Sequence, residues 1–309
     1  MGIISRLYVK NFVCRYDKQL GVPYYSYIDF EGLHRDESSF INSKGIELKY
    51  FFFYYENYKK DKTVLFLHWL DCGHAAYMAE INELCKQGYK VLALDYTGCG
   101  DSKGKYLGSI YTPTKDVLEL LDLLNLDNEI VLVGHSLGGF TALRILNVRK
   151  DITKAVILAG FIKPELELSN FIKSKFIIKG ILRYEKKMGG NLFELDNLEY
   201  LKNTKDSIFF IQSIDDQMVA YESALKIVEE INNPNIKILK MSGRKHNPTY
   251  TDNAVKYMNE VFSKFNLLVK EKKIKTKEDR LNYFKDISLE KLVKQDSNLF
   301  SEIVKFINK

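Results

Sequence analysis

IVLVGHSLGG, at residues 130–139, joins a short apolar run to a serine that has a glycine two positions away on either side. An uninterrupted apolar run of this length is typical of a strand buried on both faces of a parallel sheet. From Leu137 onward the apolar residues recur with helical spacing. The sequence therefore predicts a strand, a tight turn at Ser136 and a helix, the context in which a serine hydroxyl projects above a sheet as a nucleophile.

Short apolar runs alternate with segments of helical length along most of the chain. We predict strands at 46–55, 64–68, 90–95, 130–134, 155–159, 208–212 and 236–240, and helices near 75–87, 114–125, from 137, 220–232 and 252–266. The run at 46–55 begins with alternating apolar and polar residues, which indicates a half-buried antiparallel strand that opens the sheet. The other runs indicate parallel strands. We expect one α/β domain over residues 1–309, with an open, mostly parallel, doubly wound sheet.

Two segments depart from this alternation. Residues 161–205 are rich in apolar residues with helical spacing, which predicts a small helical cap insertion. Its apolar side chains either cover the nucleophile or only fasten the cap to the core. Residues 267–309 predict a charged linker followed by a C-terminal helix, which is expected to dock on the domain through Leu299, Ile303 and Ile307.

The composition of the 309 residues, 46% hydrophobic and 28% charged, is that of an ordinary globular protein. The formal net charge is +6, and much of it lies in the run 270–277, which is typical of a solvated connector. Neither a nucleic-acid motif nor interleaved aromatic residues accompany that run, so we expect no nucleic-acid partner. The sequence leaves the oligomeric state open.

The four cysteines are scattered, without a C-x-x-C pair or a histidine at metal-ligand spacing. This pattern predicts reduced thiols, no disulfide framework and no metal. Residues 1–10 lack the apolar run of a signal peptide, and no segment approaches the ~18 apolar residues of a transmembrane helix. We therefore expect a cytoplasmic protein without a transmembrane segment.

A serine hydroxyl is a weak nucleophile and needs a base within hydrogen-bond reach, itself oriented by an acid. His246 is the one histidine that follows Ser136 in the chain. It lies just after the strand predicted at 236–240, at the carboxyl end of that strand, where open α/β sheets place their sites. We therefore predict that His246 is the general base.

The acid is expected at the end of the preceding strand. Two aspartates, Asp215 and Asp216, follow the strand predicted at 208–212. Adjacent residues in a turn point in different directions, so only one of them can face His246. Local chemistry leaves both candidates open.

In these motifs, and in their order Ser, Asp, His, the chain resembles the α/β-hydrolase superfamily over roughly residues 46–266. It is similar in particular to bacterial esterase/lipase-like and serine-aminopeptidase-like members, and the resemblance implies the α/β-hydrolase fold. The pattern Gly-x-x-Asp-x-x-Val-Pro of these proteins aligns on Val219 and makes Asp216 the acid. Ser213 and Ala220 replace the glycine and the proline of that pattern.

The resemblance also assigns roles to two loops. Residues 95–102, DYTGCGDS, resemble a loop that braces the site, which gives Asp95 a scaffold role. Residues 68–70, HWL, occupy the place of the oxyanion loop, so the N–H groups of Leu70 and Leu137 are expected to form the oxyanion hole.

Trp69 stands where that loop usually has glycine, and its ring either narrows the acyl pocket or displaces the loop. Trp69, Cys72 and His74 are therefore candidates for lining the substrate pocket. Simple packing is the alternative for all three.

These observations predict a serine hydrolase that works by two-step acyl transfer, with Ser136, His246 and Asp216 as its triad and without a cofactor or metal. The expected partner is a small-molecule acyl substrate with an apolar group. A carboxylic ester is the first choice, and a thioester or an N-terminal peptide bond is the alternative. A catalytically silent binding module with the same fold is the competing hypothesis from another class.

Overall fold

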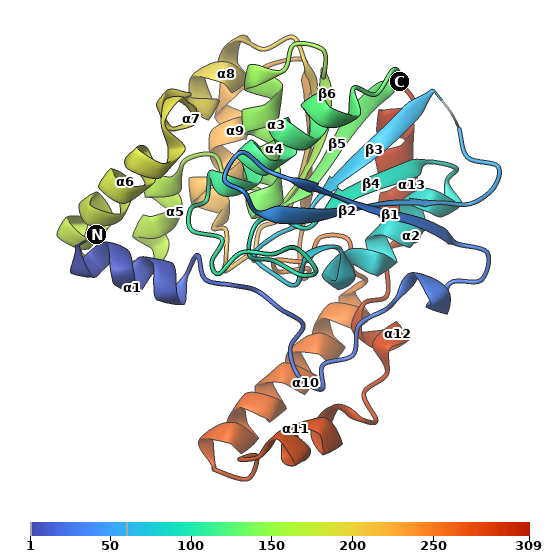
Figure 1. Ribbon diagram of the computed structural model, residues 1–309, viewed down its shortest axis with the longest axis vertical. Coiled ribbons are helices and arrows are strands. Elements are labelled where there is room, and N and C mark those ends of the chain that lie inside the picture. Colours follow the sequence, from blue (N-terminus) through green and yellow to red (C-terminus); the bar gives the residue numbers. More distant parts are fainter. Residues whose placement is uncertain (1, 60) are drawn as a thin grey trace.

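The computed structural model describes residues 2–59 and 61–309, whose strands form one sheet in the order β1-β2-β4-β3-β5-β6-β7-β8 (Figure 1). The first two strands run antiparallel to their neighbours, and the other six are parallel to one another. The predicted open, mostly parallel sheet is therefore confirmed. The strands are β1 (His34–Ile41), β2 (Glu47–Tyr54), β3 (Lys62–Leu67), β4 (Lys90–Leu94), β5 (Glu129–His135), β6 (Lys154–Leu158), β7 (Ser207–Ser213) and β8 (Ile236–Met241).

The central strands are apolar on both faces because helices cover both sides of the sheet. On one side, α3 (Thr112–Leu124), α4 (Leu137–Val148) and α9 (Leu225–Ile231) pack on residues such as Leu65 and Leu132. On the other side, α2 (Met78–Lys86) and α13 (Ser297–Ile307) pack on residues such as Val131 and Phe209. These two layers hold the sheet rigidly beneath the loops at the carboxyl ends of its strands.

A strand that the sequence did not indicate precedes the predicted first strand. β1 pairs antiparallel with β2, with Phe40 opposite Leu48, and most of its side chains are exposed. The prediction that residues 46–55 open the sheet is therefore wrong. An edge strand with two solvated faces needs no apolar alternation, so its sequence, HRDESSFI, carries no periodic signal.

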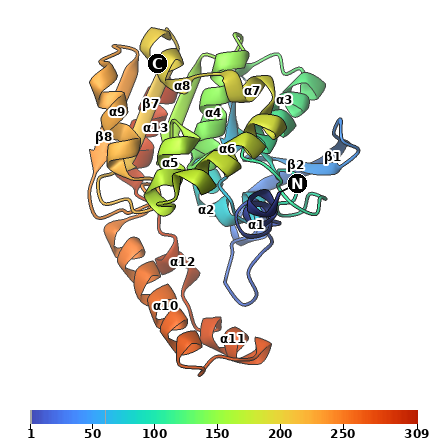
Figure 2. The same cartoon turned by 90° about the vertical axis from the view of Figure 1, so that its left-hand side faces the viewer.

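Residues 161–205 hold four helices, α5 (Pro164–Phe171), α6 (Lys175–Gly189), α7 (Asn191–Glu194) and α8 (Asn197–Asn203). α8 packs on the sheet-covering helices α4 and α9. The other three project to one side of the sheet, where α6 packs against the N-terminal helix α1 (Ile3–Asn11) (Figure 2). We call α5–α7 the cap.

Residues 267–292 are more ordered than the predicted charged linker. The long helix α10 (Asp252–Lys270) projects from the body, and α11 (Lys277–Phe284) folds back along it (Figure 1). The side-chain oxygen of Thr276 accepts the Asp279 N–H, while the Asp279 carboxylate accepts the Thr276 N–H, so α11 begins with a complete capping box. The charged run is thus the turn of a helical hairpin, which the short helix α12 (Leu289–Leu292) follows.

The chain then returns to the body, where the Phe306 ring of α13 packs on Phe209 with ring centroids 5.3 Å apart. Among the described residues, no helix has both the length and the apolar character needed to cross a bilayer.

The hairpin of α10 and α11 has its own small core, which separates its stability from that of the sheet. Phe284 is 2% exposed and packs between Phe262 and Phe265. Phe284→Ala removes about 3–5 kcal/mol of packing free energy from this core. We expect faster amide hydrogen exchange over residues 261–284 and unchanged exchange in β5. Leu281→Ala, at a 47% exposed position of the same helix, is the matched control. Unchanged exchange in the hairpin of the Phe284 variant would contradict this assignment.

Candidate active site

Ser136 occupies a strained turn between β5 and α4. Its backbone has φ 55° and ψ −113°, a conformation that residues with a Cβ rarely adopt. A Cβ added to Gly134 would lie 2.3 Å from the carbonyl oxygen of Gly138, and one added to Gly138 would lie 1.9 Å from that of Leu67. Only glycine fits at either position, which is the physical reason for the G-x-S-x-G spacing.

His246 lies in the loop after β8 and is bound to the end of β7. Its Nδ1 lies 2.8 Å from Asp216 Oδ2, and both side chains are buried. Asp216 Oδ1 accepts the N–H groups of Met218 at 2.8 Å and Val219 at 3.0 Å, so the carboxylate is held in place. A carboxylate only accepts, so His246 Nδ1 carries the proton and Nε2 has the free lone pair. Among the described residues, this Nε2 has no hydrogen-bond partner.

Asp215 turns away from His246. Its side chain is exposed, and its Oδ1 accepts the Gly243 N–H at 2.9 Å and the Ser213 hydroxyl. Asp215 therefore fastens the loop after β8 to the end of β7. The local sequence left the choice between the two aspartates open. In the structure, Asp216 is the one that contacts His246.

His135, immediately before Ser136, ties the loop of His246 to the turn of the serine. Its Nε2 donates to the His246 carbonyl oxygen at 2.7 Å, and its Nδ1 accepts the Tyr77 hydroxyl at 2.7 Å. Burial, with a smaller effect of His246, lowers the pKa of His135 to about 3, so the ring is neutral and can make both bonds. The sequence analysis missed this residue because its role depends on a loop more than 100 positions away.

The backbone of Trp69 is held by two neighbouring side chains, those of His68 and Tyr77. The Trp69 carbonyl oxygen lies 2.5 Å from His68 Nδ1, and the Trp69 N–H donates to the Tyr77 hydroxyl at 3.2 Å. His68 Nε2 accepts the Tyr96 N–H, and burial lowers the pKa of His68 to about 4, so its neutral ring donates through Nδ1. The Trp69 indole packs edge-on against His246, with ring centroids 5.0 Å apart.

The two predicted oxyanion donors are the N–H groups of Leu70 and Leu137, and both residues line the same cavity. Leu70 follows Trp69, and none of the bonds that fasten Trp69 uses the Leu70 N–H. Leu137 is the first residue of α4, and the first N–H groups of a helix have no acceptor within it. The positive end of the α4 dipole lies at the same place and favours negative charge there.

His74 lies outside the cavity that the other predicted residues line. Its N–H and its Nδ1 lie 2.7 Å and 3.0 Å from Asp95 Oδ1, and its ring stacks on Phe51. The Asp95 Oδ2 accepts the Asp101 N–H at 2.8 Å. Burial alone would raise the pKa of Asp95, but His74 and these bonds hold it below its usual value. The expectation that His74 lines the pocket is not met, because the buried Asp95 holds its ring.

The same three side chains form the one cluster with metal-ligand spacing among the described residues: the ligand atoms of His74, Asp95 and Asp101 lie within 4.8 Å of one another. Both oxygens of Asp95 already accept hydrogen bonds from the protein. A Cβ at Gly73 or Gly100 would overlap the Asp95 carboxylate, at 2.0 Å and 2.3 Å. The hydrogen bonds of Asp95 therefore join His74 and Asp101 and stabilise the loop that follows Trp69. Cys72, just before it, is buried and lies outside the cavity lining.

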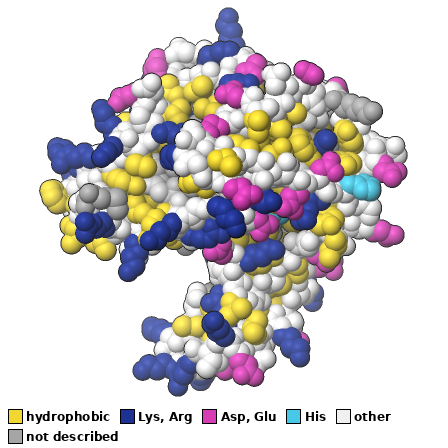
Figure 3. Space-filling view, in the orientation of Figure 1, with side chains coloured by type: hydrophobic (Ala, Val, Ile, Leu, Met, Phe, Trp, Pro, Cys, Tyr) yellow, Lys and Arg dark blue, Asp and Glu magenta, His cyan; other side chains and the backbone are white. Residues whose placement is uncertain are grey.

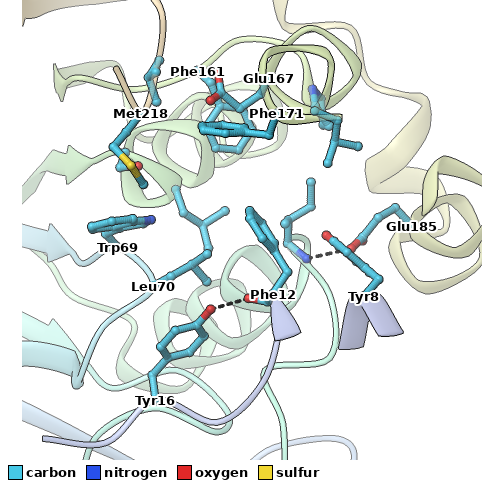
Figure 4. A pocket seen from close by; sticks show the side chains of 16 residues that line it. Tyr8, Phe12, Tyr16, Trp69, Leu70, Phe161, Glu167, Phe171, Glu185 and Met218 are labelled. Carbon is cyan, nitrogen blue, oxygen red and sulfur yellow. Dashed lines mark hydrogen bonds between the residues drawn. The ribbon is translucent and has the colours of Figure 1, made fainter. Parts of the chain in front are cut away.

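A cavity of about 290 Å³ opens above Ser136 (Figure 4). Its walls come from the N-terminal segment, the loop after β3, the residues just before α3, the turn after β5, the loop after β6, the cap and the turn after β7. The lining is almost entirely apolar or aromatic. It consists of Tyr8, Phe12, Tyr16, Trp69, Leu70, Ile110, Ser136, Leu137, Phe161, Pro164, Glu167, Leu168, Phe171, Glu185, Met218 and Val219.

Comparison with known proteins agrees with this architecture. Residues 58–192 match the family model described as serine aminopeptidase, S33. The Pyrococcus furiosus esterase Pf2001 superposes with a TM-score of 0.58 at 22% identity, covering 84% of this chain and 96% of the esterase. The chain therefore has the α/β-hydrolase fold.

Two curated proteins share sequence with part of this α/β-hydrolase. Salicylic acid-binding protein 2 of Nicotiana tabacum is 35% identical over 92 residues, which are 29% of this chain and 35% of that protein. The AB hydrolase superfamily protein YisY of Bacillus subtilis (strain 168) is 31% identical over 102 residues, 32% of this chain and 38% of that protein. The α/β-hydrolase thus spans little more than a third of the length of these relatives.

The N-terminal segment of this α/β-hydrolase supplies a wall that the sequence analysis missed. Tyr8, Phe12 and Tyr16 line the cavity, and all three precede the first predicted strand. Arg15 fixes the segment by donating to the carbonyl oxygens of Ser102, Gly104 and Gly100 at 2.9–3.0 Å. The sequence analysis assigned no element to residues 3–16, and a contact with distant parts of the chain leaves no local pattern in the sequence.

Two carboxyl groups on the cap of the α/β-hydrolase also reach the cavity. Burial, together with a smaller effect of the Asp216 charge, raises the pKa of Glu167 to about 8, and its Oε2 has no hydrogen-bond partner among the described residues. Glu185 is fully buried and accepts the Ile110 N–H at 3.3 Å and the Ser109 hydroxyl. Burial raises the pKa of Glu185 to about 7. Near neutral pH Glu167 is therefore mostly protonated, and Glu185 is about half protonated.

The raised pKa of Glu185 predicts a pH-dependent stability of the α/β-hydrolase. The unfolded chain loses this proton near pH 4.5 and the folded chain near pH 7, so the contribution of Glu185 to stability is complete below pH 4.5 and is lost as the pH rises to 7. The loss is on the order of 3 kcal/mol. Glu185→Gln keeps a hydrogen-bonding side chain without the titration.

Urea unfolding at pH 5 and pH 8 measures the effect. We expect the Glu185→Gln variant to lose less stability between these pH values than the parent does. Glu165→Gln, at an exposed position of the cap, is the control and should follow the parent. Equal pH dependence of all three proteins would show that Glu185 titrates as in the unfolded chain.

Proposed function

We propose that this α/β-hydrolase is a serine hydrolase that cleaves a carboxylic ester with an apolar acyl group. Ser136 is the nucleophile, His246 the general base and Asp216 the acid that orients it. The observation that carries the proposal is the buried hydrogen bond of 2.8 Å between Asp216 and His246, which leaves Nε2 with a free lone pair. His135, the neighbour of Ser136, donates to the backbone carbonyl oxygen of His246 at 2.7 Å, which supports a base that lies close to the serine.

In the proposed first step, Ser136 Oγ attacks the carbonyl carbon of the ester while His246 Nε2 takes the hydroxyl proton. The π electrons of the C=O bond move to its oxygen, toward which the N–H groups of Leu70 and Leu137 donate. The tetrahedral intermediate collapses with cleavage of the C–O bond to the alcohol, which leaves with the proton from His246. The acyl group remains on Ser136.

In the second step, water attacks the acyl carbon and gives a proton to His246 Nε2. The new intermediate collapses, the carboxylic acid leaves, and the proton returns to Ser136 Oγ. The Asp216 carboxylate fixes the tautomer of His246 and stabilises the imidazolium in both steps. All these groups belong to the chain itself, so the cycle uses water as its only co-substrate.

The cavity supports an acyl group of modest size. Its 290 Å³ lies at the small end of ligand pockets, and its lining from Phe12, Phe161 and Phe171 is apolar. Desolvation of an alkyl chain in such a cavity contributes about 0.8 kcal/mol per buried methylene. The proposed substrate is therefore an ester with a short or medium acyl chain.

A second candidate function is hydrolysis of an aminoacyl amide, and one observation favours it. Glu167 places a carboxyl oxygen without a hydrogen-bond partner in the cavity lining. A substrate ammonium group beside it would favour the carboxylate and form an ion pair. The matched family model, serine aminopeptidase, S33, is consistent with this alternative.

One screen separates these functions. The purified chain is assayed with p-nitrophenyl esters of increasing acyl length, with aminoacyl p-nitroanilides and with acyl thioesters. Preference for esters supports the proposal, and preference for aminoacyl amides that Glu167→Gln abolishes supports the second candidate. Absence of both hydrolysis and fluorophosphonate labelling would indicate a catalytically silent binding protein.

Replacement of the serine tests the nucleophile. Ser136→Ala keeps the Cβ and the backbone strain and removes only the attacking oxygen, so we expect kcat for the preferred ester to fall by about 10⁴-fold or more. Thermal unfolding should stay within about 2 °C of the parent, because a single exposed or cavity-facing hydroxyl contributes little to stability. Ser301→Ala, on the exposed face of α13, is the control and should keep full activity. Activity retained by a folded Ser136 variant would refute the assignment.

Replacement of each aspartate tests the acid. Asp216→Asn places an amide against His246 Nδ1 and favours the wrong tautomer, a change that costs about 10⁴-fold in kcat in serine proteases. Asp215→Asn keeps an acceptor for the Gly243 N–H and should cost at most about tenfold, or roughly 1.4 kcal/mol. Steady-state kinetics with matched thermal unfolding separate the two variants. The reverse ranking would make Asp215 the acid.

A further inference from the structure

Large apolar side chains are exposed beside the mouth of the cavity. They lie on and just after α1, at the end of α5 and on the first turn of α6, and α1 and α6 pack side by side (Figure 2). We call these positions the α1–α6 surface. Its apolar members, with their exposed fractions, are Ile3 (76%), Leu7 (56%), Phe12 (40%), Phe171 (52%), Phe176 (74%) and Ile177 (38%).

The two helices form one rigid surface. Ile4 of α1 packs so closely on α6 that a Cβ at Gly180 would lie 2.9 Å from its side chain. Tyr8 of α1 meets Tyr184 of α6 edge to face, with ring centroids 6.1 Å apart. The Tyr184 hydroxyl donates to the Gly108 carbonyl oxygen at 2.7 Å and so anchors α6 to the body. The exposed apolar groups therefore cannot turn inward together without breaking this packing.

The charged residues of α1 and of the start of α6 all carry one sign, while the acidic residues nearest to Phe171 are Glu165 and Glu167 of α5. Residues 2–13 and 172–184 contain no Asp or Glu, and their basic residues are Arg6, Lys10, Lys173, Lys175, Lys179 and Arg183. These six side chains form no ion pair with any described residue. In Figure 3 the side of the molecule at α1 shows hydrophobic side chains with Lys and Arg among them.

The combination of exposed apolar side chains and unpaired basic side chains indicates which kind of partner fits the α1–α6 surface. An exposed apolar patch of contiguous side chains marks a binding surface, and interspersed cations favour an anionic partner. Two copies of the chain meeting at this surface would bring twelve basic side chains together without a counter-charge, from six in each. An anionic lipid surface satisfies both requirements, since its headgroups neutralise Lys and Arg while apolar side chains enter the acyl boundary.

We propose that the α1–α6 surface docks this protein onto an anionic lipid bilayer. Ile3, Leu7 and Phe176 enter the boundary between headgroups and acyl chains, and the basic residues contact lipid phosphates. Phe12 and Phe171 belong both to this surface and to the cavity lining, so docking turns the cavity mouth toward the bilayer. The consequence that a lipophilic ester then enters directly from the membrane rests on the proposed function, while the docking itself does not.

Vesicle sedimentation of the full chain carrying Ser136→Ala tests the docking independently of catalysis. We expect binding to vesicles of phosphatidylglycerol and phosphatidylcholine, at least tenfold weaker binding to phosphatidylcholine alone, and weakening by 0.5 M salt. Ile3→Ser/Phe176→Ser should reduce the binding at least tenfold. Ile28→Ser/Leu123→Ser, at positions 72% and 56% exposed outside this surface, is the matched control and should bind like the parent.

Equal binding by the two double variants, or equal binding to both vesicle types, would overturn the proposal. So would a dimer in light scattering that Ile3→Ser/Phe176→Ser dissociates, because the surface would then be an interface between copies. With an active serine, the Ile3/Phe176 variant should hydrolyse a water-soluble acetyl ester like the parent, and an octanoyl ester of a lipophilic alcohol embedded in vesicles at least fivefold more slowly. Vesicle binding without hydrolysis of either ester would refute the proposed function and leave the docking intact.

Discussion

The contact between the turn after β5 and the end of β3 is the constraint on which the site depends. The backbone of Gly138 lies so close to the carbonyl oxygen of Leu67 that no Cβ fits between them. This approach brings the start of α4 beside the loop of Trp69 and Leu70. A single tight turn therefore aligns Ser136, the end of the α4 dipole and the neighbouring loop, and the sheet keeps them aligned because helices cover both of its faces.

Contacts from the ends of three strands, and not only its own loop, hold His246 in position. The turn after β7 supplies Asp216, the end of β5 supplies His135, and the loop after β3 supplies Trp69, each in contact with His246. Parallel strands end at the same edge of the sheet, so residues far apart in the chain meet there. The same neighbours exclude water from the ring, which strengthens its hydrogen bond to the carboxylate.

The N-terminal segment links parts of the molecule that the sheet alone does not connect. Its helix packs on the cap, its Tyr16 pairs with the loop around Gly98 and Gly100, and its Leu20 accepts a hydrogen bond from Arg280 of α11. The N-terminal segment is therefore fastened to three separate parts of the molecule, of which the cap also lines the cavity. Because α1 and α6 hold each other through small contacts such as Ile4 on Gly180, the shape of the mouth depends on this segment as much as on the cap.

The sequence by itself determined the parallel sheet, the turn at Ser136 and the order of the polar residues at the strand ends, because buried strands and tight glycine turns leave periodic, local patterns. Local pattern did not reveal β1, because an edge strand needs no apolar face. It also did not reveal the helical hairpin around Lys270, because the charged run there obscures the few apolar residues that form the core of the hairpin. Only the tertiary structure decided three other features. Asp216, and not Asp215, contacts His246, and His74 binds Asp95 instead of lining the cavity. Aromatic side chains from residues 8–16 form one wall of the cavity. Each is a contact between segments distant in the chain, and side-chain direction at such a contact is set by the packing of both partners, which no single segment encodes.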